Sequence, residues 1–358
     1  MIMTSHIRID ELVKIARRRR LDRVFVANEA NIRALTGITC DNAILQILNL
    51  KSQISTFFYT DFRYIPMVHR VAPKLAVKDI KRFGKKTGKR SPDRFNRIGY
   101  ESSIPHAKFL SWQKKFPKAT FVDISKDLAA IRAVKTPDEI AALRAAEKLD
   151  CEIWETARGK FKAGMTERQM ARIIQKLMIE RGEGEAFATI VCVGKNAAEC
   201  HHEPDDTVWN GREPVLVDMG VKLNGVCSDL TRNILPSSSV ARLPSLYRKV
   251  YQLVLEANLA AIAAAKPGMT GKALDKVARD VIRKGGFGKC FGHSLGHGVG
   301  YEIHEAPSAS KKGDMVLKPG MLVTIEPGIY LEDNLGVRIE DLILITETGC
   351  EVLSTCEK

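Results

Sequence analysis

The sequence has no closely spaced cysteine pair and no long apolar run. Its eight cysteines are scattered with no CxxC pair, which argues against a zinc ribbon or a disulfide framework and favours reduced thiols. It contains no apolar stretch of about 18 residues, the length of a membrane span. The polar, basic start of the chain does not resemble a signal peptide either. We therefore expect a cytoplasmic protein without a membrane span.

Acidic residues are scarce in the first third of the chain. The net charge is +14, and residues 1–132 hold 27 Lys/Arg against 11 Asp/Glu, whereas residues 133–358 hold 29 against 31. A composition of 45% hydrophobic and 27% charged residues is typical of globular proteins and argues against disorder. The length and the uneven charge predict two domains, 1–132 and 133–358.

The basic excess is concentrated at residues 17–20 and 78–90. Such segments could bind nucleic acid or an acidic surface, or they could be a solvated helix face and a basic surface loop. The sequence contains neither a recognised nucleic-acid module nor a series of base-stacking aromatic residues. We therefore favour the second interpretation and expect no nucleic-acid partner.

Helix-like and strand-like segments alternate in the first domain. A helical apolar spacing at 9–21 is followed by strand-like segments at 23–27, 43–61 (two strands around a turn), 97–101 and 119–125. This alternation predicts a small α/β domain.

The second domain contains two similar segments, 161–183 and 265–287. Each has Gly-Met-Thr before an amphipathic stretch, and its Thr166 or Thr270 can cap a helix. Two copies of a helix-then-sheet unit would pack as related halves around one central site. Chance similarity between two capped helices is the alternative.

Two aspartates lie on either side of a predicted hairpin in residues 212–235. Asn224-Gly225 is a strong hairpin signal, and if it forms the loop, Leu223 pairs with Val226. Continuing that ladder makes Asp218 and Asp229 diagonal neighbours on one face of the sheet. Two unpaired buried carboxylates would repel, so this arrangement favours a bound cation.

Residues 290–305 contain three of the eight histidines, His293, His297 and His304, among several glycines. The glycines argue against a helical HExxH zinc site, and the spacing of a phosphate loop is absent. They fit a strand or loop whose backbone passes close to a ligand.

Residues 321–346 read as a strand, a turn and a second strand. Glu326 would end the first strand and Glu340 would lie within the second, where an ion pair with Arg338 is the alternative to a metal. Four carboxylates and one histidine form a hard, oxygen-rich ligand set. This set suits a pair of divalent ions, Mn²⁺ foremost, with Co²⁺, Fe²⁺ or Zn²⁺ as alternatives.

These segments resemble the successive motifs of the M24 pita-bread metallopeptidases, in the aminopeptidase P and prolidase branch. The matching motifs of the second domain are HHEP (201–204), VDMG (217–220), CSDLTR (227–232), GHSLGHGVG (292–300), HEAP (304–307), IEPGIY (325–330) and VRIED (337–341). NIRALTG (31–37) and YTDFRY (59–64) resemble the creatinase-type N-terminal domain of that branch. The resemblance implies an α/β N-terminal domain followed by a pseudo-twofold pita-bread catalytic domain, often dimeric.

The resemblance also implies roles for individual residues. Asp218 would bind the first metal, His297 and Glu326 the second, and Asp229 and Glu340 would bridge the two. Glu326 would also act in catalysis. His201 and His304 would contact the substrate and the developing oxyanion, His293 would line the pocket, and Arg338 would brace the bridging glutamate.

One departure bears on the substrate. Prolidases commonly carry an arginine just after HE-x-P, where it can grip the carboxylate of a dipeptide, but Ser308 occupies that place here. We therefore expect an Xaa-Pro aminopeptidase, a homodimer acting on peptides with proline second. An Xaa-Pro dipeptidase and a catalytically silent peptide-binding module are the alternatives.

Overall fold

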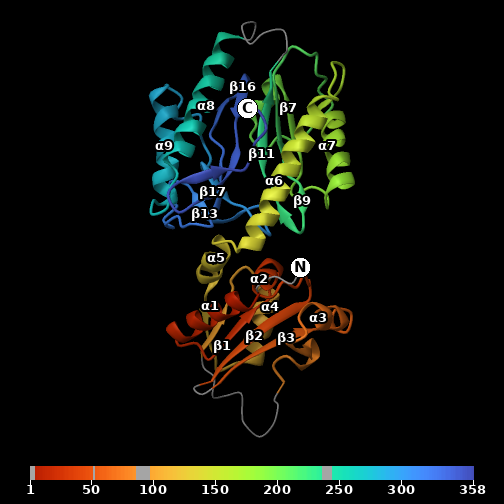
Figure 1. Ribbon diagram of the computed structural model, residues 1–358, viewed down its shortest axis with the longest axis vertical. Helices are drawn as coiled ribbons and strands as arrows, with labels where there is room; N and C mark the ends of the chain where they lie inside the picture. Colours follow the sequence, from red (N-terminus) through yellow and green to blue (C-terminus); the bar gives the residue numbers. More distant parts are fainter. Residues whose placement is uncertain (1–4, 51–52, 86–96, 236–243) are drawn as a thin grey trace. The chain divides into compact units, whose positions relative to one another are not determined.

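The computed structural model describes residues 5–50, 53–85, 97–235 and 244–358 (Figure 1). The chain divides into two compact units, Met1–Arg132 and Ala133–Lys358. Residues 86–90 of the second basic segment lie outside the described residues.

The first unit is built on one six-stranded mixed sheet. Its strand order is β4-β3-β2-β1-β5-β6, in which β1–β2 and β2–β3 are antiparallel and the other neighbours are parallel. The strands are β1 (Arg23–Val26), β2 (Ala43–Leu50), β3 (Gln53–Thr60), β4 (Ala76–Asp79), β5 (Arg97–Tyr100) and β6 (Thr120–Asp123). The helices are α1 (Ser5–Arg18), α2 (Glu29–Thr36), α3 (Ile65–Val71), the short η1 (Ile80–Arg82), α4 (His106–Lys115) and α5 (Ser125–Ala133).

Both faces of this sheet are buried. Along β1, Val24 and Val26 belong to one apolar cluster and Phe25 to another, because successive side chains of a strand point to opposite faces. Phe25 contacts Phe83 and Trp112 edge to face, with ring centroids 5.0 and 5.3 Å apart. The predicted α/β organisation of this part of the chain is confirmed.

The second unit combines helix pairs with several small sheets. Its helices are α6 (Pro137–Arg158), α7 (Glu167–Arg181), η3 (Gly194–Ala198), α8 (Ser245–Ala264) and α9 (Gly271–Lys284). Its strands are β7 (Ile190–Val193), β8 (Val215–Met219), β9 (Lys222–Leu223), β10 (Val226–Cys227), β11 (Leu230–Ile234), β12 (Gly296–Gly298), β13 (Glu305–Ala309), β14 (Leu322–Ile325), β15 (Gly328–Leu331), β16 (Leu335–Arg338), β17 (Asp341–Ile345) and β18 (Cys350–Val352). The sheets are β11-β8-β7, β9-β10, β12-β13, β14-β17-β18 and β15-β16.

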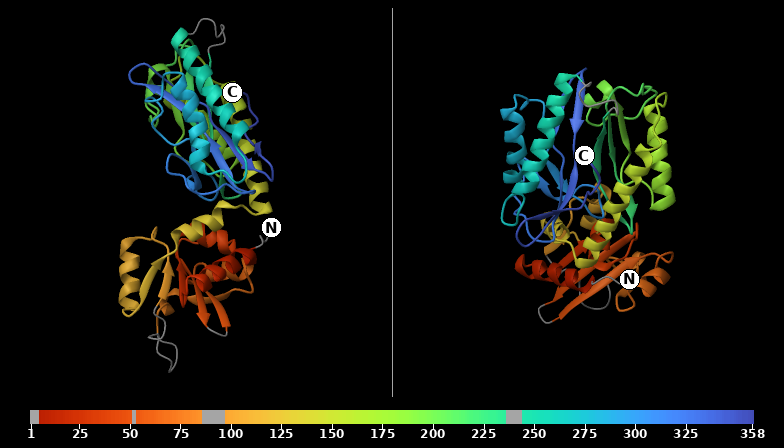
Figure 2. Two further views of the ribbon diagram at one scale, coloured as in Figure 1. Left: turned by 90° about the vertical axis from the view of Figure 1, so that its left-hand side faces the viewer. Right: turned by 45° about the horizontal axis from the view of Figure 1, so that its top comes forward.

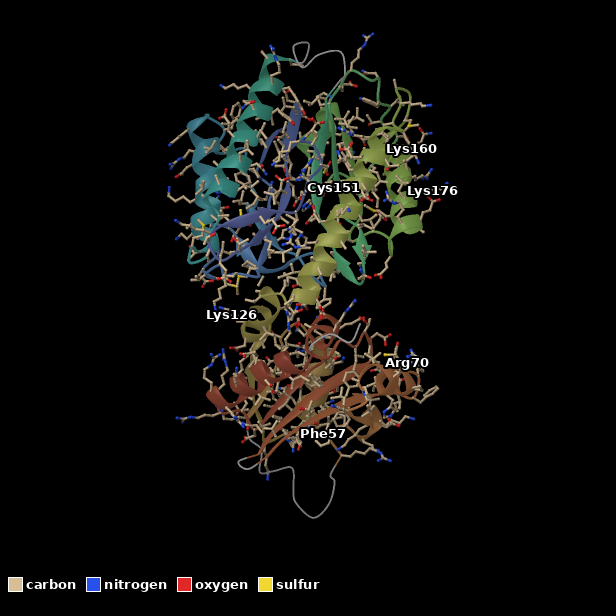
Figure 3. The ribbon with its side chains drawn as sticks, in the orientation of Figure 1. Phe57, Arg70, Lys126, Cys151, Lys160 and Lys176 are labelled. Carbon is tan, nitrogen blue, oxygen red and sulfur yellow. The ribbon has the colours of Figure 1, made fainter. Side chains whose placement is uncertain are left out.

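Each half of this unit packs one helix pair against strands. The strands of this unit lie between the pair α6 and α7 and the pair α8 and α9 (Figure 2). One apolar cluster joins α6 and α7 to β7, β8 and β11, and another joins α8 and α9 to β14 and β17. Figure 3 shows Cys151 of α6 in the interior, whereas Lys160 and Lys176 extend into solvent. No helix among the described residues has the length and apolar character that crossing a membrane requires.

Two threonines cap helices of this unit, as the sequence predicts. Thr166 caps α7 by accepting a hydrogen bond from the N–H of Gln169, and Thr270 caps α9 through the N–H of Ala273. Each cap satisfies one otherwise unpaired backbone donor, and loss of such a cap typically costs about 1 kcal/mol. The two Gly-Met-Thr segments therefore begin corresponding helices in the two halves.

Candidate metal centre

The first two carboxylates are placed by a hairpin. Asn224 and Gly225 have φ angles of 52° and 67°, and Leu223 pairs with Val226. The same register continues into the next ladder, where Asp218 pairs with Thr231. Asp229 lies two residues before Thr231, so it shares a sheet face with Asp218. The predicted diagonal arrangement of the two aspartates is confirmed.

His297 is the central residue of β12, between two glycines. A Cβ on Gly296 would collide with the carbonyl of Thr324, and one on Gly298 would collide with the carbonyl of Ala306. These glycines therefore allow β12 to lie against neighbouring backbone. The sequence-based explanation was close approach of a ligand, and Gly296 also lines the cavity described below.

The last two glutamates lie just outside strands. The segment 321–346 forms two nested strand pairs, β14 with β17 and β15 with β16, in place of the single predicted pair. Glu326 follows β14, as expected, but Glu340 lies between β16 and β17 and within neither. The chain leaves strand geometry at Glu340 because β16 pairs with β15, whereas β17 pairs with β14.

The five side chains line one cavity of about 600 Å³. Ligand atoms of Asp229, His297 and Glu340 all lie within 4.8 Å of one another. The Nε2 atom of His297 is 3.5 Å from Asp229 Oδ2 and 3.4 Å from Glu326 Oε1. Residues more than 120 positions apart in the sequence therefore converge on one polar centre.

The carboxylates of this centre hold their protons more tightly than usual. Burial raises the pKa of Asp229 and of Glu326 well above the ordinary range, and the negative charge of Glu340 adds to it. Burial and the charge of Asp218 raise the pKa of Glu340 to about 8. Burial also lowers the pKa of His297 to about 4, so its imidazole is neutral, the form that binds metals. Either protons or cations must therefore neutralise the four acids near neutral pH.

The residues present fit a pair of divalent cations. Asp218 Oδ1 is buried and lacks a hydrogen-bond partner among the described residues, so it is available as a ligand. Other oxygens are oriented by their neighbours, since Thr231 donates to Glu340 at 2.7 Å and Thr324 donates to Glu326 at 3.3 Å. Carboxylates with one imidazole form a ligand set for Mn²⁺ and similar ions.

Arg338 braces a different carboxylate from the one expected. Its Nη2 donates to Asp218 Oδ2 at 2.6 Å, and its Nε donates to the hydroxyl of Thr231 at 3.1 Å. Because Thr231 in turn donates to Glu340, the guanidinium is linked to Glu340 through that hydroxyl. Its direct ion pair is with Asp218, because the β8–β11 ladder brings that residue next to β16.

All three histidines of residues 290–305 line the cavity, together with His201. The ring of His304 lies edge to face with that of His297 at 4.3 Å between centroids. His293 is held from two sides, because its Nδ1 donates to the carbonyl of Ser294 at 2.7 Å and its Nε2 lies 2.9 Å from the Tyr330 hydroxyl. Burial lowers the pKa of His293 to about 4, so it is neutral.

Some residues of the site gave no sequence signal. Tyr330 accepts a hydrogen bond from Arg338 at 2.8 Å and so links the guanidinium to His293. Glu147 of α6 is fully buried and accepts the backbone N–H of Asp229 at 3.3 Å. Tyr330 belongs to the IEPGIY segment, but nothing in its spacing indicated a role, and Glu147 resembles any other glutamate of a long helix.

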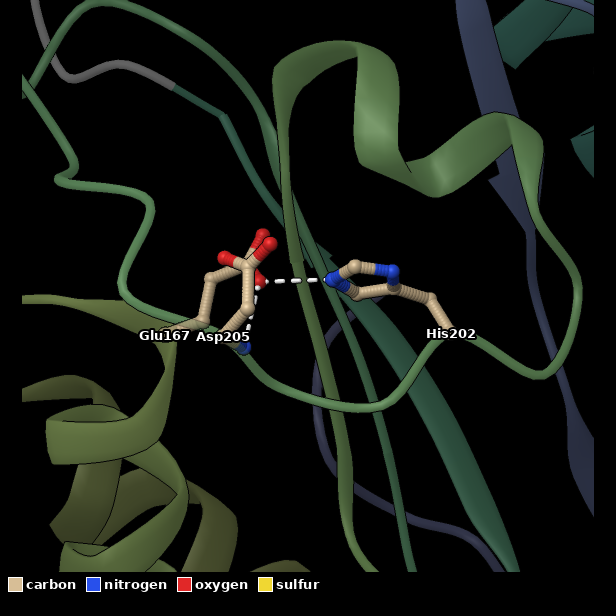
Figure 4. A group of neighbouring side chains, drawn as sticks. All are labelled: Glu167, His202 and Asp205. Atoms are coloured by element: carbon tan, nitrogen blue, oxygen red, sulfur yellow. Dashed lines mark hydrogen bonds and ion pairs between the residues drawn. The ribbon is translucent and has the colours of Figure 1, made fainter.

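A second group of potential ligands lies elsewhere in this unit. Glu167, His202 and Asp205 have ligand atoms within 4.8 Å of one another (Figure 4). The sequence analysis singled out His201 of the HHEP segment. It did not predict that His202 contacts Glu167.

Comparisons with known proteins agree with this geometry. Residues 141–347 match metallopeptidase family M24, and residues 8–134 match the creatinase/prolidase N-terminal domain. An Xaa-Pro dipeptidase of Pyrococcus furiosus is 45% identical over 54% of this chain, and the match spans only 55% of that protein.

Solved structures align over nearly the full chain. A prolidase from Pyrococcus furiosus has a TM-score of 0.87 and 33% identity, covering 97% of this chain and 100% of its own. An X-Pro aminopeptidase from Thermotoga maritima has a TM-score of 0.83 and 30% identity, covering 97% of both chains. The expected combination of a creatinase-type domain and a pita-bread domain is confirmed.

Proposed function

Because the chain belongs to metallopeptidase family M24, we propose that it is a two-metal exopeptidase that hydrolyses Xaa-Pro dipeptides. The observation that carries the proposal is the cavity in which Asp218, Asp229, His297, Glu326 and Glu340 meet. The named relatives support this dipeptidase function better than the aminopeptidase that the sequence favoured.

We assign the metal ligands as the family resemblance implies. Asp218 would hold the first ion, His297 and Glu326 the second, and Asp229 and Glu340 would bridge them. When bound, divalent ions supply Lewis-acid chemistry, which polarises a carbonyl and makes water nucleophilic near neutral pH. Mn²⁺ is the expected metal because the set is rich in oxygen.

The protein's own groups would move the protons. Glu326 would accept the proton of the attacking water and deliver it to the leaving proline nitrogen. His304 and His201, which line the same cavity, would donate hydrogen bonds to the oxyanion as charge develops on it. The Tyr330 hydroxyl and the Ser294 carbonyl would keep the ring of His293 at the wall of the substrate pocket.

An Xaa-Pro aminopeptidase is the second candidate, and Ser308 favours it. Ser308 lines the cavity, at the position where the resemblance to prolidases led us to expect an arginine. Among the described residues that line the cavity, the one Lys or Arg is Arg338, which is already paired with Asp218. A dipeptide carboxylate would therefore lack a dedicated guanidinium, whereas a longer peptide would not need one.

Peptide length separates the two candidates. The protein is supplied with Mn²⁺ and given Xaa-Pro dipeptides and Xaa-Pro-Yaa tripeptides with the same first residue, and kcat/KM is measured for each. Preferential turnover of dipeptides supports the dipeptidase. Preferential release of the first residue from tripeptides supports the aminopeptidase.

Elemental analysis tests the metal centre independently of activity. About two divalent ions per chain would support the enzyme, whereas none in chelator-free protein would favour a silent peptide-binding module. The expected homodimer is tested by light scattering, and the expected cytoplasmic location by fractionation.

A further inference from the structure

Glu167 is hydrogen-bonded to both His202 and Asp205 (Figure 4). Glu167 is the first residue of α7 and is fully buried. Its Oε2 lies 2.7 Å from Nε2 of His202 and accepts the backbone N–H of Asp205 at 3.1 Å. Its other oxygen faces the end of β7.

This network leaves no room for a metal ion. Two ligands of one tetrahedral Zn²⁺, each about 2.0–2.2 Å from the ion, lie about 3.3 Å apart. The 2.7 Å separation between His202 and Glu167 is shorter and is that of a hydrogen bond. A carboxylate has about four lone pairs, and all four of Glu167 are used, because its Oε1 also accepts from Val193 N at 2.6 Å and Asn196 Nδ2 at 2.9 Å.

Glu167 instead ties three segments together. It joins the N-terminus of α7 to Val193 at the end of β7 and to the segment 202–205. Backbone bonds reinforce the junction, since the N–H groups of Glu167 and Arg168 donate to the carbonyls of Thr207 and Asp205, both at 3.1 Å. A carboxylate is favoured at a helix N-terminus, so this buried charge is stabilised where it lies.

The imidazole of His202 lies between two acidic side chains. Its Nε2 faces Glu167, and its Nδ1 lies 3.3 Å from Oε2 of Glu199. Burial lowers the pKa of His202, but the hydrogen bond to Glu167 and the charges of the nearby acids outweigh it, so the pKa is raised overall. Charged bonds of this kind fix both the ring and the backbone that carries it.

The residue before His202 is His201, which lines the metal cavity. Adjacent residues of one short segment thus point to different places, His202 into the network and His201 into the cavity. We propose that Glu167 and His202 are positioning residues, which hold the segment 199–205 so that His201 faces the substrate. This inference rests on the proposed function, since it concerns the same reaction.

The test is a double-mutant cycle on the full chain loaded with Mn²⁺. Glu167→Gln keeps the size of the side chain but removes its charge and replaces one acceptor by a donor. Because a misplacement of about 1 Å can slow catalysis by about 10²-fold, we expect kcat to fall about 10–100-fold with KM changed less than about 3-fold. Metal content measured by elemental analysis should stay the same as in the wild type.

The cycle separates positioning from a general loss of structure. In a His201→Ala background, Glu167→Gln should lower kcat less than about 2-fold further, because the residue it positions is already gone. Asp138→Asn is the matched control: it removes an acid from the first turn of α6 and should change kcat less than about 2-fold. If Glu167→Gln fails to fold, His202→Ala replaces it and should lower kcat to a similar extent, because it removes the ring that joins the segment 199–205 to Glu167.

Equal losses of kcat with and without His201 would overturn the inference. A metal ion bound to the wild type and lost in Glu167→Gln would overturn it too, by making the network a metal site. A wild-type protein that cleaves no Xaa-Pro peptide would overturn the proposed function and the inference with it, so the two failures are distinguishable.

Discussion

Glu340→Gln should make the metal-free protein more stable while abolishing its activity. Glu340 is 2% exposed, and burial with the charge of Asp218 raises its pKa to about 8. An unfolded glutamate ionises near pH 4.3, so between these values the unfolded state has released a proton that the folded state retains. The folded state is therefore penalised increasingly as the pH rises from about 4.3 to 8.

The size of this effect follows from the pKa difference. At pH 7 the penalty is about 4 kcal/mol, given about 1.4 kcal/mol for each pH unit above the unfolded pKa, and at pH 4.5 it is below about 1 kcal/mol. Glutamine cannot ionise, and its amide oxygen can still accept the hydroxyl of Thr231, which is 2.7 Å from Glu340. The variant should thus gain stability at pH 7 and little at pH 4.5.

Urea unfolding in chelator at pH 4.5, 6 and 7 measures the difference between variant and wild type. Comparing the two proteins cancels the titration of other groups, such as His293 and His297, whose lowered pKa values give the opposite pH dependence. Added Mn²⁺ should reverse the ranking, because the wild type binds the ions. A metal-free Glu340→Gln protein that is destabilised equally at every pH would refute this reasoning.

Three further predictions concern the site and its scaffold. Asp229→Ala should abolish metal binding and peptide hydrolysis together, as measured by elemental analysis and by a peptidase assay; full activity in the metal-free variant would contradict the two-metal assignment. Ser308→Arg should raise kcat/KM for Xaa-Pro dipeptides about tenfold relative to tripeptides, because a guanidinium binds a carboxylate through charged hydrogen bonds; an unchanged ratio would place the carboxylate elsewhere. Thr166→Ala should lower the free energy of unfolding by about 1 kcal/mol through loss of the α7 cap, as measured with urea, and a change below about 0.3 kcal/mol would count against the cap.

The parts of the site set by local rules could be predicted from the sequence. Asn224-Gly225 fixes the hairpin register, and the alternation of side chains along a strand then places Asp218 and Asp229 on one face. Thr166 and Thr270 start helices through contacts only three residues away. In each case the determining interaction lies within one supersecondary unit, so its pattern is visible in a short stretch of sequence.

The parts set by distant partners could not be predicted in this way. Glu340 was placed within a strand because the sequence does not show that β14 pairs with β17 around the inner β15–β16 hairpin. Arg338 was paired with Glu340, its neighbour on the chain, but it contacts Asp218, which is 120 residues away. The contact of Glu167 with His202 was not predicted for the same reason, since the two residues are 35 positions apart in the sequence.

The charge of the cavity connects the metal number to the choice of substrate. Among the described residues that line it, four carboxylates and the guanidinium of Arg338 give a formal charge of −3 when all are ionised. One divalent ion would leave an excess of negative charge that repels the carboxylate of a dipeptide, whereas two would leave about +1 and attract it. A fully loaded centre can therefore favour a dipeptide without an arginine at position 308. On this argument dipeptide turnover should fall more steeply than tripeptide turnover when the metal is titrated from about two ions per chain to one, and equal declines would show that the carboxylate does not respond to the charge of the centre.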